Sequence, residues 1–278
     1  MLFHKEKDGD LMADKRSNRY EAILEHVFFD NYEQGNDEVN FERDDLVKAA
    51  SSLNIDLPKN LGDVIYSTRY RTSLPSSICE LAPEGKEWII RGRGRAKYAF
   101  CLAGTFRIKP NEMLLTTKIP DATPEIIRAA AQTDEQALLA VIRYNRLIDI
   151  FLGVAAYSLQ NHLRTTVEEI GQVEIDEIYV AVDSAGQQYI IPVQAKGHND
   201  EIGVTQPEQD LAVCSSKWPS FTSRSIAVQF MDDGVVALFL LVMNDGEIRV
   251  AKEAHYELVP YAEITDEDRS LYRQAENI

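Results

Sequence analysis

Four side chains suited to phosphoryl chemistry stand at alternate positions in two apolar segments of the chain. Glu174 and Asp176 lie in VEIDEIYV, and Gln194 and Lys196 lie in VQAKG. Residues two apart on a strand point to the same side of a sheet, so each pair shares a face if these segments are strands. If the two strands pair as a hairpin, an acid, an amide and an ammonium group converge.

Hydrolysis of a phosphodiester bond uses these groups. A carboxylate holds Mg²⁺, the ion lowers the pKa of a bound water, and a lysine orients that water or stabilises the developing charge. The structural alternative is a cross-strand ion pair between Asp176 and Lys196, which would contribute little to stability. Lys196 ends a strongly apolar segment and is followed by Gly197, which favours the rim of an active site.

The periodicity of the second half predicts an α/β (α+β) arrangement around these residues. A long amphipathic helical region comes first, with a break near Gly153, and is followed by two strands, a helix and two further strands. We expect the helices over 133–164 and 206–218, and the strands over 171–183, 188–196, 225–231 and 235–243.

This pattern resembles the PD-(D/E)xK nuclease superfamily, which has the restriction-endonuclease-like fold of a mixed sheet flanked by helices. The resemblance implies that Asp176 is the Asp of the motif and that Gln194 and Lys196 are its final pair. It also implies Mg²⁺ as cofactor and an upstream Glu as a further ligand. Glu168 and Glu169 lie shortly before the first strand and fit this role, and we favour Glu169. Glu174 is a further candidate for metal binding.

Three features depart from the family pattern. Gln194 replaces the commoner carboxylate, so another acid must hold the metal. Pro192 removes a donor from the sheet, which implies an edge position or a bulge. The family has three strands before the second helix, whereas the sequence indicates two.

The first half predicts a small DNA-recognition domain. Helical patterns over 19–32, 41–54 and 60–71 precede two short strands within 87–103, which flank a glycine-rich basic turn. Three helices followed by a basic hairpin is the order of a winged-helix module, in which a helix enters the major groove and the wing contacts the DNA backbone. A small helical domain that mediates protein contacts is the alternative.

The distribution of charge agrees with a DNA-binding segment. The chain of 278 residues has a net charge of -16, but residues 51–120 carry 11 basic and 6 acidic side chains. The local field, rather than the net charge, decides whether a surface attracts phosphate. The basic side chains that we expect to contact DNA are Arg69, Arg71, Arg91, Arg93, Arg95 and Lys97, with Arg143 and Arg146 on the long helix. A solvated charged face is the alternative for both groups.

Composition excludes several other classes. There is no apolar run of about 18 residues, as a membrane span requires, and the N-terminal segment has no apolar core typical of a secretory signal. The three cysteines are too few and too widely spaced for a disulfide framework or a zinc cage, so we expect a cytoplasmic protein. The Pro-punctuated stretch KIPDATPEI is the expected domain boundary.

The sequence therefore predicts a winged-helix-like domain over 15–110 and a restriction-endonuclease-like catalytic domain over 125–262. The resemblance implies a type II-like restriction enzyme that cuts double-stranded DNA with Mg²⁺, leaves 5′-phosphates and acts as a homodimer, with a cognate methyltransferase in the same system. Two alternatives remain open: a non-catalytic DNA-binding regulator with a degenerate nuclease-like domain, and a junction or repair nuclease.

Overall fold

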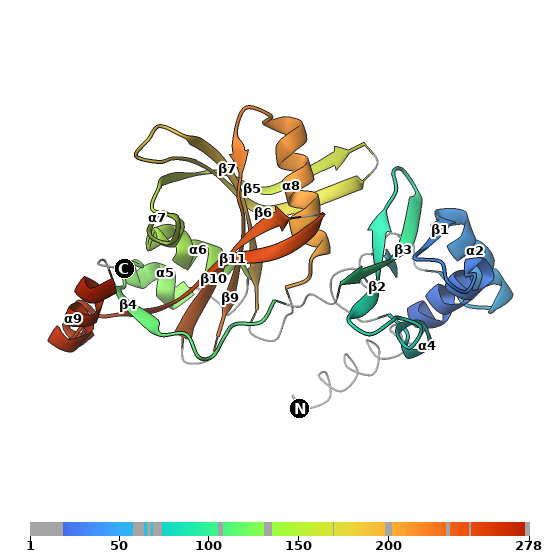
Figure 1. The fold of residues 1–278 in the computed structure, drawn as a ribbon, viewed down its shortest axis with the longest axis horizontal. Coiled ribbons are helices and arrows are strands. Elements are labelled where there is room, and N and C mark those ends of the chain that lie inside the picture. Colours follow the sequence, from blue (N-terminus) through green and yellow to red (C-terminus); the bar gives the residue numbers. More distant parts are fainter. Residues whose placement is uncertain are drawn as a thin grey trace, which may run out of the picture. The chain divides into compact units, whose positions relative to one another are not determined.

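An eight-stranded mixed sheet forms the centre of the larger of two units. The computed structural model describes residues 19–57, 64, 65, 68, 74–104, 108–130, 135–168, 170–197, 202–231, 234–244 and 246–275. The smaller unit comprises residues 1–106 and 166–172, and the larger comprises 107–165 and 173–278 (Figure 1). The division falls earlier in the chain than the Pro-rich boundary that the sequence suggests, because β4 (Thr116–Pro120) pairs with β11 (Glu247–Val259) in the larger sheet.

The smaller unit is built from helices and a three-stranded sheet of order β1-β3-β2. A helix over residues 19–31 is followed by β1 (Glu38–Glu42), α2 (Arg43–Ser52), α4 (Ser76–Cys79), β2 (Lys86–Gly92) and β3 (Lys97–Gly104). The expected hairpin of β2 and β3 is confirmed. Strand β1 was not predicted. The sequence pattern assigns Phe41 and Glu42 to a helix, but they belong to β1 and the helix begins at Arg43.

Aromatic side chains form the core of the smaller unit. Phe28 packs edge-to-face against Trp88 and Phe100, with 5.1 Å between ring centroids in each case. At the start of α2, the Glu42 backbone N–H donates to the Asp45 carboxylate at 2.8 Å, which satisfies a donor at the helix end. Of the third predicted helix, the described residues Val64, Ile65 and Thr68 are helical, whereas Arg69 and Arg71 lie outside the described residues.

The sheet of the larger unit has the order β4-β11-β10-β9-β7-β6-β5. Strands β6 (Gly171–Val182) and β7 (Gln188–Lys196) pair antiparallel, whereas β7 and β9 (Ser225–Phe230) pair parallel. A parallel pair requires a crossover, and α8 (Thr205–Lys217) supplies it. The remaining strands are the short β8 (Thr222–Ser223), which pairs with β7, and β10 (Val235–Asn244), which lies between β9 and β11.

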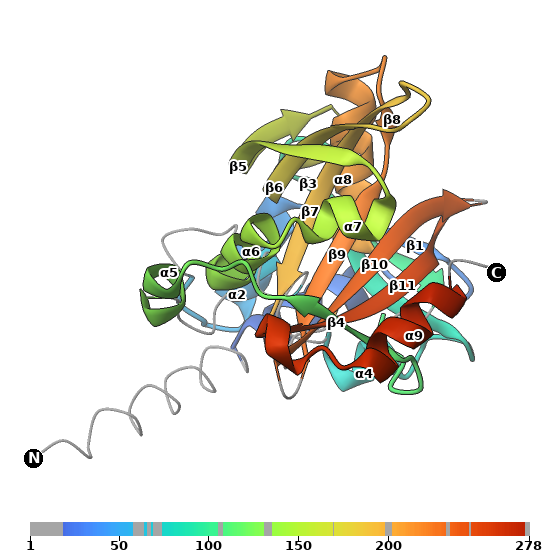
Figure 2. The ribbon, with the colours of Figure 1, turned by 90° about the vertical axis from the view of Figure 1, so that its left-hand side faces the viewer.

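Helices cover both faces of this sheet, with α6 (Glu135–Tyr144) and α7 (Leu147–Leu152) on one side and α8 on the other (Figures 1 and 2). Strand β7 is consequently buried along most of its length, as its continuous apolar sequence predicts. The alternation of β7 sends Val193 and Ala195 into the core with α6, which leaves Gln194 and Lys196 for the opposite face. The unit also contains α5 (Glu125–Ala130), a 3-10 turn over Tyr261–Glu263 and α9 (Asp266–Ala275).

The prediction of a helix through residue 164 is wrong. Gly153 adopts a left-handed conformation (φ 67°) that ends α7, and the chain continues as strand β5 (Ala155–Val167), at the edge of the sheet beside β6. Three strands, β5, β6 and β7, therefore lie between α7 and α8, rather than the two that the sequence indicates.

Pro192 is also placed differently from the prediction, because β7 is a central strand rather than an edge. On one side, β8 pairs with Tyr189 and Ile190, and β9 pairs with β7 from Val193 onward. Pro192 falls between these two pairings, which is where a missing N–H interrupts the fewest sheet hydrogen bonds.

Candidate active site

Asp176 and Lys196 approach each other across the β6–β7 hairpin. Asp176 stands next to Glu177, which pairs with Val193 of the hairpin, and its Oδ2 accepts a hydrogen bond from the Ala195 backbone N–H at 3.0 Å. Burial raises the pKa of Asp176, while this hydrogen bond and the positive charge of Lys196 oppose the rise. Lys196 therefore acts electrostatically on Asp176 from the neighbouring strand.

Gln194 connects this hairpin to α8. Its side chain is 1% exposed, and its Nε2 donates to Oδ2 of Asp210 at 3.2 Å. Asp210 is fully buried, and its pKa lies well above the usual range because of that burial, with a further increase from the charge of Asp176. The polar face of the hairpin therefore faces a second buried acid.

Two oxygen atoms of this cluster have no hydrogen-bond partner within the described residues, Oε1 of Gln194 and Oδ1 of Asp210. Carboxylate and amide oxygens are the hard ligands that Mg²⁺ prefers. These two oxygen atoms are therefore of the kind that can bind a small divalent cation.

Lys196 lies at the end of β7 with 14% of its side chain exposed, and its Nζ is 3.7 Å from Oε1 of Glu135. Glu135 stands at the first position of α6, the helix that precedes the three strands. The positive charge of Lys196 opposes the rise that burial causes in the pKa of Asp176 and of Asp210, so the ammonium group acts on both acids.

Of the upstream acids that the sequence suggests, Glu174 raises the pKa of Asp176 through its charge, while its own carboxylate pairs with side chains of β5. Glu174 is 3.1 Å from Arg164 and 3.7 Å from His162, both on β5. Glu168 is exposed in the turn after β5, and Glu169 lies outside the described residues. Across the parts of the chain that the structure describes, no three His, Cys, Asp or Glu side chains gather closely enough to hold a metal ion.

Comparison with known proteins adds no relative. No family model, curated protein or solved structure matches this chain. Residue geometry therefore carries the functional argument.

Asp210 and Glu135 are the members of the cluster that sequence reasoning did not place. Asp210 precedes the buried Val213 and Cys214 by three and four residues, so it shares their face of α8. A single acid on the apolar face of a helix was the available signal. Glu135 carried no comparable signal, because an acid in the first turn is common wherever a helix begins.

Arg143, which is predicted to contact DNA, pairs with a buried acid on the opposite face of the sheet. Its Nε and Nη2 lie 3.0 and 2.9 Å from Oε1 of Glu177, which is fully buried and also accepts from the Ser158 hydroxyl. Arg146 pairs with Asp149 at the start of α7. Both arginines line a pocket of about 290 Å³ together with Tyr157 and Tyr179.

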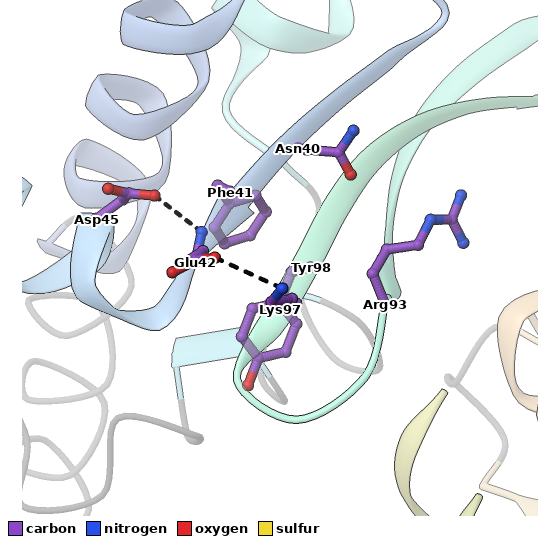
Figure 3. Close-up of a pocket in the computed structure, with 7 residues that line it drawn as sticks. All are labelled: Asn40, Phe41, Glu42, Asp45, Arg93, Lys97 and Tyr98. Carbon is purple, nitrogen blue, oxygen red and sulfur yellow. Dashed lines mark hydrogen bonds and ion pairs between the residues drawn. The ribbon is translucent and has the colours of Figure 1, made fainter. Parts of the chain in front are cut away.

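The basic turn between β2 and β3 carries both paired and exposed cations. Arg93 forms a bidentate pair with Glu38 of β1, at 3.1 and 2.8 Å, and Lys97 is 3.9 Å from Glu42. Arg95 is exposed at the tip of the turn, and Arg91 is half-buried. Beside the turn is an open pocket of about 300 Å³, where Figure 3 shows the Lys97–Glu42 pair; it is lined by Asn40, Phe41, Glu42, Asp45, Arg93, Lys97 and Tyr98.

Among helices of the described residues, none is both long enough and apolar enough to cross a bilayer.

Proposed function

We propose that this protein is a Mg²⁺-dependent DNA endonuclease of the PD-(D/E)xK type, with its catalytic centre on the β6–β7 hairpin of the larger unit. The observation that carries the proposal is the shared environment of Asp176, Gln194 and Lys196. Asp176 is bound to the backbone next to Gln194, and Lys196 acts electrostatically on Asp176.

The residues have distinct roles in the proposed reaction. Asp176 and the Oε1 atom of Gln194 would hold Mg²⁺, which supplies an activated water and offsets the charge of the phosphate. Lys196 would orient the attacking water and stabilise the charge that develops on the phosphoryl oxygens. Glu135 holds the ammonium group of Lys196 at the rim of the site.

The order of elements supports the restriction-endonuclease-like fold as the framework. Helices α6 and α7 come first along the chain, then the three strands β5, β6 and β7, helix α8, the short β8 and strand β9. The strand that the sequence pattern lacked is β5. Pro192 at the junction of two strand pairings removes the need for an edge position.

The smaller unit is proposed as the winged-helix-like module that recognises DNA. The β2–β3 hairpin, with Arg95 exposed at its turn, is the wing that would contact the phosphate backbone. A homodimer would match a two-fold symmetric DNA site, and the molar mass of the free and DNA-bound protein tests this: a monomer in both states would contradict it.

The decisive experiment is incubation of the wild type and Lys196→Ala with long DNA of mixed sequence, in Mg²⁺ and in chelator. Lys217→Ala is the matched control, because Lys217 is an exposed lysine in the last turn of α8. We expect discrete fragments from the wild type and the control in Mg²⁺ only, and none from Lys196→Ala. DNA binding without cleavage by any of the three proteins, on mixed, methylated or branched DNA, would favour a regulator instead.

A further inference from the structure

The α8 face of the sheet buries more acceptor oxygens than it supplies donors for. Gln194 and Asp210 are 1% and 0% exposed, and a single hydrogen bond, from Nε2 to Oδ2, connects them. In the described structure, the amide oxygen Oε1 of Gln194 and the second carboxylate oxygen, Oδ1, of Asp210 have no hydrogen-bond partner. A buried polar atom without a partner costs about 1–3 kcal/mol, so two neighbouring ones call for an explanation.

The charges around these oxygens are also unbalanced. The charge of Asp176 on β6 raises the pKa of Asp210 on α8. The positive charge of Lys196 opposes the rise in the pKa of both acids. Lys196 is itself shared with Glu135, at 3.7 Å. The buried Asp210 and the half-buried Asp176, with part of one ammonium charge, form a site that a divalent cation would neutralise.

We propose that Asp210 provides the carboxylate ligand that position 194 lacks, so that Mg²⁺ binds between Asp176, the amide oxygen of Gln194 and Asp210. The inference rests on the proposed function for its choice of metal. The motif places a carboxylate on the strand where this chain has an amide. Here α8 presents the carboxylate, and the hydrogen bond from the Gln194 side chain holds it beside that strand position.

Exchanging the two groups tests this assignment. The Gln194→Glu/Asp210→Asn double variant returns the carboxylate to the strand and puts an amide on the helix, with nearly the same volumes and a hydrogen bond between the same two side chains. Mn²⁺ is the probe, titrated calorimetrically into the full-length protein without DNA, and thermal unfolding in chelator checks the fold of each variant.

We expect Asp210→Asn to weaken Mn²⁺ binding at least tenfold and the double variant to restore it to within about threefold of the wild type. Gln194→Glu alone, which has both carboxylates, should bind Mn²⁺ more tightly than the wild type. Glu208→Gln, which removes another carboxylate from the first turn of α8, is the control and should leave the affinity unchanged.

Each contrary result has one meaning. Unchanged binding by Asp210→Asn would overturn the assignment, and so would a loss that the double variant does not restore, because Asp210 would then only position Gln194. If the wild type binds no Mn²⁺, this inference and the proposed function both fail. If the exchange restores Mn²⁺ binding but the wild type cuts no DNA, the metal site stands and the nuclease proposal fails.

Discussion

Replacement of Arg143 by methionine separates a structural role of this arginine from the DNA contact that its sequence suggests. In the structure, two of its nitrogens lie within 3.0 Å of one oxygen of Glu177, a carboxylate with no exposed surface. Methionine keeps much of the length and volume of the arginine side chain but removes its charge. The variant therefore leaves a buried negative charge whose remaining hydrogen-bond donor is the Ser158 hydroxyl.

Loss of one partner of a buried ion pair typically costs about 3–5 kcal/mol. Because the Arg143 side chain is 37% exposed, water can enter beside Glu177, and we expect a loss of about 2–3 kcal/mol. With a urea dependence of about 2 kcal/mol per M, this corresponds to a fall of about 1 M in the unfolding midpoint. Adding Glu177→Gln to Arg143→Met should recover much of the loss, since the unpaired charge is then gone.

The larger unit must be observed separately, because a chain with two units need not unfold in one step. The two tryptophans make this possible: Trp88 is in the smaller unit and Trp218 in the larger one. In a Trp88→Phe background, the fluorescence of Trp218 reports on the larger unit during urea unfolding.

Arg146→Met is the matched control, since Arg146 is 60% exposed and its solvent-screened pair with Asp149 should contribute much less to stability than the Arg143–Glu177 pair. An Arg143→Met midpoint equal to that of the control, combined with weaker DNA binding, would refute the structural argument. It would then favour the phosphate contact.

Three further predictions follow from burial and charge. Burial raises the pKa of Asp210, so above about pH 4 the folded state keeps a proton that the unfolded state has lost. In chelator, the free energy of unfolding should therefore fall as the pH rises above about 4. Asp210→Asn should flatten this pH dependence in urea unfolding, and identical profiles for the variant and the wild type would contradict the prediction. In the native protein a thiol reagent should label Cys79, which is exposed, and spare Cys101 and Cys214, since burial raises the pKa of both and that of Cys214 reaches about 12; mass spectrometry showing more than one label would count against this. Arg95→Ala should reduce the slope of log affinity for DNA against log salt by about one, and an unchanged slope in a salt titration would remove the wing from the DNA interface.

Local pattern was sufficient for the central strands of the larger unit. The predicted return strand over 188–196 coincides with β7, and the predicted helix over 206–218 differs from α8 by one residue at each end. Both segments have strong periodicity and are bounded by turn residues. The face shared by Gln194 and Lys196 follows directly from the two-residue repeat of a strand.

Local pattern failed where a neighbour decides the conformation. Residues 155–164 have polar side chains that suit an exposed helix, yet they form β5 because they pair with β6 at the edge of the sheet. Strand formation depends on such partners more than helix formation does. The helix break near Gly153 was visible in the sequence, but the strand that follows it was not.

The sequence by itself determined which strands carry Asp176, Gln194 and Lys196 and that the last two share one side of β7, because these properties depend on spacing within one segment. Only the tertiary structure decided which acids join them. Asp210 meets Gln194 from 16 residues away, while Glu174, on the same strand as Asp176, pairs with Arg164. Arg143 likewise pairs with Glu177, because a buried charge requires a partner from whichever element packs against it. Packing between elements that are distant in the sequence decides these partners, and the spacing of residues along the chain does not predict that packing.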